Sequence, residues 1–434
     1  MTDVSSVLII GAGIFGTSTA YHLAQSHPHL SVTVLDRTPA PPTQAASTDI
    51  NKIIRADYSS PFYASLAYEA IDAWSSWPSL KHFYHRTGWV MLDEKDSDLA
   101  ERIREVFRNR GHDPTSDVPL DEIGSGSKWG GVLRGTNTAG FRDAYWNPEA
   151  GWCEAGKATA GLLDEAVKDG VRYICGEVED LVLDDNGVKG VKLKSEQVIT
   201  ADKVVLATGA WTSALMTAIE DKLDIPESDR VERQATAAGV CVAHYKMSTK
   251  EMRDLAEMPV VVYGENGEAI PPPQDCQLLK FTNAHTFTNT VTTKSGHAIS
   301  APPDRDQHIV PEKLQQETHE TMMAQLMPRF TEGKQVDHWR LCWDAFTPTQ
   351  DWLLSGHPDK RLDGLYFAVG GSFHSYKFLP TAGKYMVNVL NGRGNGKEMD
   401  TAWGWKSIRA GRGAHEKTAP KRELADFKII SAEL

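Results

Sequence analysis

The chain contains 434 residues, 41% of them hydrophobic and 24% charged, and it carries a formal net charge of −12. These proportions exclude a disordered or fibrous chain, and the length indicates two domains or one elaborate domain, because a single core seldom organises so many residues. The acidic balance argues against a nucleic-acid partner and against binding to an anionic membrane surface.

The cysteines and the apolar runs predict the compartment. The five cysteines are scattered, odd in number and without the spacing of a zinc site, which favours free thiols in a reducing environment and no bound metal. No apolar run reaches the roughly 18 residues of a membrane span, and the first residues lack the pattern of a signal peptide. We therefore expect a cytoplasmic protein, and the final residues SAEL resemble a peroxisomal address only weakly.

The first elements predicted along the chain are a strand, a glycine turn, a helix and a second strand, within SSVLIIGAGIFGTSTAYHLAQSHPHLSVTVLDR. Gly11, Gly13 and Gly16 fit G-x-G-x-x-G, and Ile14 and Phe15 lie between them. Such glycines allow the backbone to approach a pyrophosphate at the helix N-terminus. A purely structural strand–helix–strand unit is the alternative.

Asp36 closes the second strand, 20 residues after the last glycine of the motif. A carboxylate at this place accepts hydrogen bonds from an adenosine ribose. Arg37 follows and suits a 2′-phosphate, but Asp36 would repel that group. The pair therefore favours FAD or NAD over NADP.

A proline-rich stretch, TPAPPTQ, leads from this unit into STDINKIIRADY. The second segment places Lys52 and Arg55 three residues apart. Arg55 taken alone is equally well explained as an exposed side chain, and so is Lys377 further along the chain.

Two predicted elements in the middle of the chain complete a split dinucleotide-binding unit. VEDLVLDDNGVKGVKL alternates apolar and polar residues around Asp-Asn-Gly, which indicates a β-hairpin. ADKVVLATGAWTSAL reads as a strand, a turn containing Gly209 and Trp211, and a helix. In flavoproteins, a strand followed by such a turn and helix brings the chain back to the edge of the FAD-binding sheet.

The last three predicted elements each carry a conspicuous residue. Lys280 ends an apolar run in CQLLKFTNAHTF, where a lysine either reaches solvent or is held in a site. Cys342 lies among aromatic residues in HWRLCWDAFTPTQDWLLSGHP, although most free cysteines are structural. GLYFAVGGSFHSYKFLPTAGKYMVNVL reads as a strand, a Gly370–Gly371 turn and a helix, whose N-terminus would stabilise negative charge on a flavin ring.

In this order, these blocks resemble the monomeric sarcosine oxidase family of flavoproteins. The likeness is greatest to its fungal branch, the fructosyl amino acid oxidases (amadoriases) and the saccharopine or pipecolate oxidases. It spans nearly the whole chain and is most specific in STDINKIIRADY, LLKFTNAH, RLCWDAFTPTQDW and GGSFHSYKFLP.

The resemblance implies an α/β fold of two domains. A discontinuous Rossmann-like FAD-binding domain would comprise residues 1–85, 150–225 and 339–434. A substrate domain, residues 86–149 and 226–338, would cover the flavin with a mixed or antiparallel sheet.

The resemblance also implies that FAD is joined covalently to Cys342, a tether that raises the reduction potential of the flavin. Ser47, Thr48 and Lys52 would lie beside the flavin. The complete set of residues expected to contact the cofactor is Gly11, Gly13, Ile14, Phe15, Gly16, Asp36, Arg37, Ser47, Thr48, Lys52, Gly209, Trp211, Cys342, Gly371, Phe373, His374 and Lys377.

Three cations acquire catalytic roles from the resemblance. Arg55 and Lys377 would clamp the carboxylate of the substrate, and the planar guanidinium suits two parallel hydrogen bonds. Lys280 would lie over the flavin, where a fixed cation in a dry site lowers the barrier to electron transfer to O2. His285 matches an amadoriase histidine, with a buried structural histidine as the alternative.

Two departures from the amadoriase pattern bear on the substrate. Ala284 stands where amadoriases have a glutamate that touches the sugar, and a methyl group makes no hydrogen bond. Gly404 and Lys406 stand in a segment where amadoriases have carboxylate-binding arginines. Arg55 and the residues after it resemble the saccharopine and pipecolate oxidases better.

We therefore predict a monomeric FAD-dependent oxidase of a small secondary-amine amino acid, which transfers hydride to the flavin and reduces O2 to H2O2. A fructosyl amino acid oxidase and a biosynthetic flavoenzyme acting on an N-methyl or cyclic amine remain alternatives with the same chemistry. A non-catalytic flavin-binding protein and an NAD dehydrogenase are alternatives of other classes.

Overall fold

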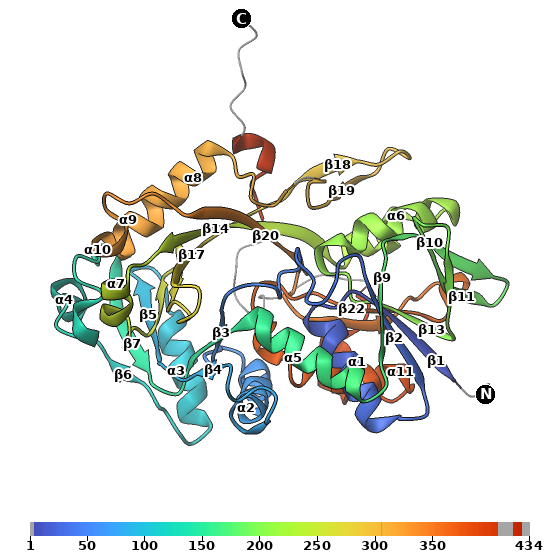
Figure 1. Cartoon of the computed structure of the whole chain (residues 1–434), viewed down its shortest axis with the longest axis horizontal. Coiled ribbons are helices and arrows are strands. Elements are labelled where there is room, and N and C mark those ends of the chain that lie inside the picture. The colour runs from blue at the N-terminus through green and yellow to red at the C-terminus, as the bar shows by residue number, and fades with distance from the viewer. Residues whose placement is uncertain (1–3, 305, 407–419, 428–434) are drawn as a thin grey trace, which may run out of the picture.

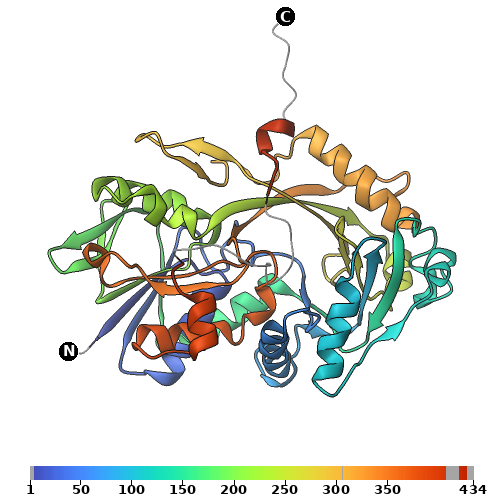
Figure 2. The ribbon, with the colours of Figure 1, turned by 180° about the vertical axis from the view of Figure 1, so that it is seen from behind.

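The computed structural model describes residues 4–304, 306–406 and 420–427, and two large sheets dominate it (Figure 1). One sheet has six strands and the other has eight. The fold is therefore α/β with a mixed second sheet, as the sequence predicts. Figure 2 shows the same arrangement from behind.

The six-stranded sheet is parallel except at one edge, where β21 runs antiparallel to β22. Its central strands are apolar and buried because helices and a hairpin cover both faces, as a parallel sheet requires. The strand order is β21 (Leu353–Gly356), β22 (Leu365–Val369), β13 (Lys203–Leu206), β1 (Ser6–Ile10), β2 (Ser31–Asp36), β9 (Arg172–Cys175).

Three helices cover one face of this sheet. Helix α1 (Ile14–Ser26) lies between α5 (Ala155–Lys168) and α11 (Ala382–Leu390), and it packs against both. The residues predicted at helical spacing on α1, Ala20 and Leu23 among them, are buried there. The largest hydrophobic cluster lies between these helices and the sheet.

The eight-stranded sheet is antiparallel except where β15 pairs in parallel with β5. Its order is β20 (His338–Phe346), β14 (Thr236–Lys246), β17 (Leu278–Phe287), β16 (Gly267–Ile270), β15 (Val260–Tyr263), β5 (Trp89–Glu94), β7 (Phe141–Asn147), β6 (Ser116–Asp117). Alternate residues of its strands pack on the outer side against apolar residues of the segment from Met322 to Phe330. The opposite side faces inward.

Smaller elements complete the structure. The antiparallel strands are β10 (Val178–Asp184), β11 (Gly187–Leu193) and β12 (Val198–Thr200); β3 (Lys52–Ile54), β8 (Gly151–Cys153) and β4 (Tyr84–His85); and β18 (Thr290–Thr292) with β19 (Ala298–Ser300). The other α-helices described are α2 (Pro61–Ser76), α3 (Leu99–Asn109), α4 (Leu120–Ser125), α6 (Thr212–Lys222), α7 (Thr249–Asp254), α8 (Glu312–Thr318), α9 (Ala324–Leu326), α10 (Pro328–Thr331) and α12 (Lys397–Trp403).

Short helices of other types link these elements. A π-helical turn, η5 (His319–Met323), joins α8 to α9. The 3-10 helices are η1 (Trp129–Gly131), η2 (Gly209–Trp211), η3 (Glu227–Asp229), η4 (Val231–Arg233), η6 (Lys360–Leu362), η7 (Tyr376–Phe378) and η8 (Leu424–Phe427).

The predicted elements are confirmed in order. The glycine turn joins β1 to α1, the hairpin signal lies between β10 and β11, and the following strand and helix are β13 and α6. One difference concerns the last block, where the 3-10 helix η7 precedes α11. The turn after β22 contains Ser372 and Phe373 at positive φ, so the chain changes direction before α11 begins.

The domain boundaries stay a prediction. Strand β20, placed with the FAD-binding domain in that prediction, pairs with β14 in the eight-stranded sheet. The final SAEL lies outside the described residues. Among the helices that the structure describes, none has the length and apolarity needed to cross a membrane.

Candidate active site

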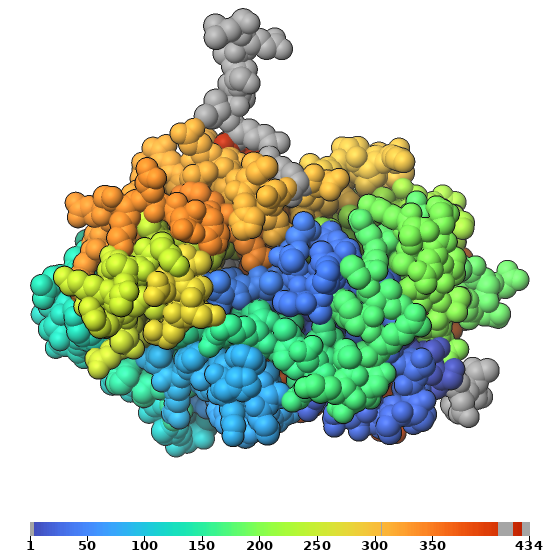
Figure 3. All heavy atoms as spheres, viewed as in Figure 1, coloured from blue at the N-terminus to red at the C-terminus, as the bar shows by residue number. Residues whose placement is uncertain are grey.

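A cavity of about 860 Å³ is lined by residues of both large sheets. Strands β1, β2 and β22 contribute their carboxyl ends, and strands β14, β16, β17 and β20 contribute their inward faces. Parallel sheets bind ligands in the crevice beyond the carboxyl ends of their strands. The space-filling view shows how N-terminal segments, coloured blue, lie between the green and the yellow-to-orange parts of the chain (Figure 3).

The glycine turn forms one end of the cavity. Gly11 has φ +101°, and a Cβ atom built on it would lie 2.4 Å from the carbonyl oxygen of Ala207. Gly16 is needed for a different contact, because its Cβ would lie 1.9 Å from the carbonyl oxygen of Gly11. Helix α1 begins directly after Gly13 without a side-chain cap, so its first amide groups are left for a ligand.

The end of β2 adds charged groups to this part of the cavity. One carboxylate oxygen of Asp36 accepts a hydrogen bond from the amide of Ala12, at 2.9 Å. The guanidinium of Arg37 lies over the ring of Trp211, 4.2 Å from its centroid. The glycine cradle, the uncapped helix and this carboxylate fit the adenosine diphosphate half of FAD.

The middle of the cavity is apolar and contains Cys342. Cys342 forms a small buried cluster with Val240 and Val242, and Phe373 packs against it. The hydroxyl of Ser47 is buried, lines the cavity and makes no hydrogen bond with any other described residue. An apolar slot with one unsatisfied hydroxyl fits a flat heteroaromatic ring with polar edges.

Of the five cysteines, all of which lie in the described part of the chain, only Cys342 lines the cavity. Cys241 lies on the neighbouring strand β14 but is buried in a separate cluster, and burial raises the pKa of its thiol to about 12. Cys342 is therefore the one thiol that a bound flavin would meet.

A buried carboxylate, Asp49, organises two lysines beside the flavin slot. Its Oδ2 atom lies 2.6 Å from Nζ of Lys280 and 3.0 Å from Nζ of Lys52. Burial alone would raise the pKa of Asp49, but the two lysines outweigh it and lower that pKa. Burial lowers the pKa of Lys280, although Asp49 opposes the shift. Lys52 lines the cavity, whereas Lys280 lies behind it.

Arg340 joins the loop before Asp49 to the strand that carries Cys342. Its guanidinium donates hydrogen bonds to the carbonyl oxygens of Thr48 and Ala45. The loop containing Ser47 is thereby held against β20, two residues from the thiol.

Arg55 and Lys377 lie together at the far end of the cavity. The guanidinium of Arg55 lies between the rings of Tyr58 and Trp89, 4.7 Å from each centroid. Nζ of Lys377 donates a hydrogen bond to the hydroxyl of Tyr58, at 3.0 Å, and another to the carbonyl oxygen of His374. Burial, and then the charge of Arg55, hold the pKa of Lys377 well below its ordinary value.

Asp57 neutralises part of this positive charge. The carboxylate is buried and accepts hydrogen bonds from the hydroxyl of Tyr145 and the amide of Asn147, both at 2.9 Å. Burial raises its pKa, and the charge of Arg55 opposes the shift. Arg55 is therefore held by aromatic rings and a fixed counter-charge while it faces the cavity.

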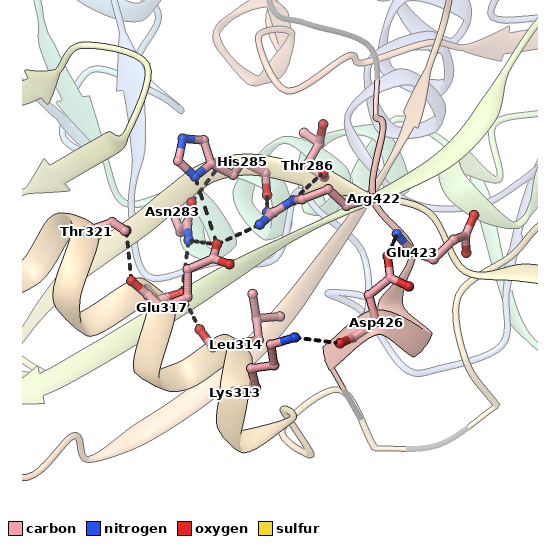
Figure 4. Close-up of polar contacts among 11 residues, drawn as sticks. Asn283, His285, Thr286, Lys313, Leu314, Glu317, Thr321, Arg422, Glu423 and Asp426 are labelled. Atoms are coloured by element: carbon pink, nitrogen blue, oxygen red, sulfur yellow. Dashed lines mark hydrogen bonds and ion pairs between the residues drawn. The ribbon is translucent and has the colours of Figure 1, made fainter. Parts of the chain in front are cut away.

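The rim of the cavity is built from β17 and the C-terminal segment (Figure 4). Arg422 forms an ion pair with Glu317 of α8, at 2.7 Å, and donates a hydrogen bond to the carbonyl oxygen of His285. The imidazole of His285, whose Nδ1 lies 3.9 Å from the carboxylate, together with the hydrogen bond and charge of Arg422, outweighs burial and lowers the pKa of Glu317 to about 2. His285 lies at the rim, partly exposed, and not in the core.

Most residues predicted for the site line this one cavity. The exceptions are Gly16, Thr48 and Lys280. Gly16 permits close packing, Thr48 belongs to the loop held by Arg340, and Lys280 bonds to Asp49. Their roles toward a cofactor stay predictions.

Sequence reasoning missed several cavity residues, Trp89, Glu268 and Asp344 among them. Asp344 had a usable signal, because it lies two residues after Cys342 on one strand and so on the same face. Trp89 and Glu268 had none, since only the pairing of distant strands brings them to the cavity.

Comparisons with known proteins agree with this geometry. Residues 6–389 match the model of a family described as DAO, FAD dependent oxidoreductase. L-saccharopine oxidase of Schizosaccharomyces pombe is 26% identical, with 98% of each chain covered. Peroxisomal sarcosine oxidase of Homo sapiens is 24% identical, covering 89% of this chain and 92% of its own. A modified fructosyl peptide oxidase from Aspergillus nidulans, solved in complex with FSA, is 26% identical with a TM-score of 0.81 and 98% of both chains covered.

Proposed function

The chain belongs to the family of FAD dependent oxidoreductases, and from this premise we propose that it oxidises the C–N bond of a secondary-amine amino acid. A hydride leaves the carbon beside the amine, O2 becomes H2O2, and water converts the resulting imine to a carbonyl compound and a primary amine unless the imine is cyclic. FAD, when bound, supplies the two-electron acceptor.

The pair of Arg55 and Lys377 carries this proposal. The two cations come from distant parts of the chain, meet on the ring of Tyr58 and face the same cavity as Cys342. Two cationic donors at one point recognise a carboxylate, and the Arg fork permits two parallel hydrogen bonds. The names of the relatives, which act on saccharopine and sarcosine, support a substrate that joins a carboxylate to a secondary amine.

A fructosyl amino acid oxidase is the second candidate, because the likeness to the fructosyl peptide oxidase is equally complete. Ala284 weighs against it. This residue lines the cavity and offers a methyl group to a substrate rich in hydroxyl groups.

A peroxide-coupled screen tests the proposed function. The wild-type protein, supplied with saccharopine, pipecolate, N-methyl amino acids and fructosyl-valine, should produce peroxide with at least one of the first three. Arg55→Ala should raise the apparent KM for every carboxylate substrate by at least ten-fold, because charge-assisted hydrogen bonds are lost. Faster turnover of fructosyl-valine would favour the second candidate, and absence of peroxide with every amine would indicate a non-catalytic flavin-binding protein.

We further propose that Cys342 bonds covalently to the flavin. In support, it is the only cysteine of the chain that lines the cavity, and Lys52 lies close enough to interact with its charge.

Acid precipitation tests the tether. The wild-type protein should give a yellow pellet, and its mass should exceed that of the polypeptide by one FAD. Cys342→Ser should release the flavin into the supernatant, whereas the control Cys241→Ser should keep the pellet yellow. A colourless wild-type pellet would contradict a covalent bond.

The role proposed for Lys280 in oxygen reduction requires a connection to the cavity. Lys52 supplies one, because both lysines bond to the same oxygen of Asp49. We also propose, as the sequence predicts, that the protein is a cytoplasmic monomer and that O2 is its electron acceptor.

A further inference from the structure

Glu268 is a cavity residue whose carboxylate has no structural role that the described residues reveal. It lies on β16, in register with Thr282 of β17 and Val262 of β15, and all three residues line the cavity. Alternate residues of a strand point to opposite faces. The next residue, Ala269, accordingly packs in the outer core, so Glu268 faces inward.

The carboxylate of Glu268 makes no hydrogen bond and no ion pair with another residue in the described part of the chain. Of the other acidic residues that line the cavity near β16, Asp57 accepts hydrogen bonds from Tyr145 and Asn147, and Asp93 pairs with Arg142. Glu94 accepts a hydrogen bond from the amide of Glu265, whose own carboxylate is exposed, whereas that of Glu268 is half-buried. A half-buried carboxylate without a partner loses solvation for no gain unless a ligand supplies the partner.

The charge of Glu268 raises the pKa of two buried lysines to which it does not bond. Its charge acts on both Lys280 and Lys377, which places the carboxylate within electrostatic reach of the flavin slot and of the carboxylate clamp. Each lysine bonds elsewhere, Lys280 to Asp49 and Lys377 to Tyr58. Glu268 therefore remains available for a cationic group placed between them.

We propose that Glu268 recognises the positively charged nitrogen of the substrate, and so selects zwitterions over simple carboxylates. This inference rests on the proposed function, in which Arg55 and Lys377 hold the substrate carboxylate. In this proposal the ammonium group of an amino acid held by that clamp meets Glu268, the half-buried acid on the inner face of the sheet that has no partner among the described residues. A carboxylate in a partly desolvated site favours a cation over a neutral group of equal shape.

Two probes of matched shape test the proposal on the flavin-loaded protein. Trimethylglycine carries a carboxylate and a permanent positive charge, whereas 3,3-dimethylbutanoate has a carbon atom in place of the nitrogen. Neither has the amine lone pair that oxidation needs, so their dissociation constants follow directly from the change in flavin absorbance on titration.

The wild-type protein should bind trimethylglycine more tightly than 3,3-dimethylbutanoate. Glu268→Gln should reduce the ratio of the two affinities at least ten-fold and leave the affinity for 3,3-dimethylbutanoate within two-fold. Glu257→Gln removes the same charge from an exposed position away from the cavity and should change neither value. Should the Gln variant not retain flavin, Glu268→Ala serves for the same comparison.

The outcomes distinguish the role of Glu268 from the carboxylate clamp of Arg55 and Lys377. A ratio that is unchanged in the Glu268 variant, with both compounds still bound, overturns the role of Glu268 alone. Failure of both compounds to bind the wild-type protein overturns the carboxylate clamp, and with it the proposed function.

Discussion

At the scale of single residues, the charge of Lys377 depends on what occupies the cavity. In the described structure its ammonium group is buried, and Arg55 lies close to it, so its pKa is held well below the ordinary value of a lysine. A carboxylate bound between Arg55 and Lys377 would place a negative charge beside the ammonium group and offset the charge of Arg55, and so would raise the pKa of Lys377. Carboxylate binding should therefore be coupled to uptake of a proton by Lys377.

The affinity for an unreactive carboxylate such as 3,3-dimethylbutanoate should consequently fall as the pH rises through the lowered pKa of Lys377. The decline should approach ten-fold per pH unit above that pKa, since one proton is taken up. Lys377→Met should bind more weakly at low pH and lose this dependence, whereas Lys250→Met, on the surface, should behave as wild type. An affinity that is flat from about pH 6 to pH 10 would show that Lys377 keeps its proton in the empty site.

At the scale of elements, the approach of α11 to α1 depends on one glycine. The amide of Gly383 donates a hydrogen bond of 2.7 Å to the hydroxyl of Ser18. A Cβ atom on Gly383 would lie 2.1 Å from the backbone carbonyl of Ser18. Helix α1 carries the phosphate-binding turn at its start, so this contact also positions the cofactor end of the cavity.

Gly383→Ala should separate the two helices and reduce the free energy of unfolding by about 1–3 kcal/mol. The denaturant midpoint, followed by circular dichroism, measures this loss. Gly140→Ala is the matched control, because no atom lies within 4 Å of its Cβ position and the change should stay within about 0.5 kcal/mol. A Gly383 variant as stable as the control would mean that the helix contact relaxes without cost.

At the scale of the whole molecule, Asp49 connects the two large sheets. It follows the loop that leaves the six-stranded sheet, and it forms an ion pair with Lys280 in the middle of the eight-stranded sheet. A buried pair contributes little net stability while complete, but removing one partner leaves an uncompensated charge. The junction that encloses the cavity is thus sensitive to this one carboxylate.

Asp49→Asn should lower the free energy of unfolding at neutral pH by about 3–5 kcal/mol. The pKa of Asp49 is lower in the folded state than in the unfolded state, since the lysines outweigh burial. Its contribution is therefore complete above the unfolded pKa of about 3.9 and declines as the pH falls below it. Urea midpoints should show that the variant loses less stability than wild type on acidification below about pH 4, with Asp121→Asn as an exposed control.

Sequence alone was sufficient wherever the signal was local. The G-x-G-x-x-G turn, the hairpin before Gly187, the strand that ends before Thr208 and the family itself follow from spacing within short segments, and the structure and the family match confirm them. Local spacing is sufficient because a tight turn or an alternating strand depends only on neighbours in the chain.

Tertiary structure alone decided how those segments combine at the site. Arg55 and Lys377 share the ring of Tyr58, Lys280 lies behind Asp49 and not on the cavity wall, and the pairing of β16 with β17 turns Glu268 inward. Each of these contacts joins residues far apart in sequence. Their geometry is set by packing and strand register, which the pattern of one segment does not contain, because burial and charge balance depend on every element that encloses the cavity.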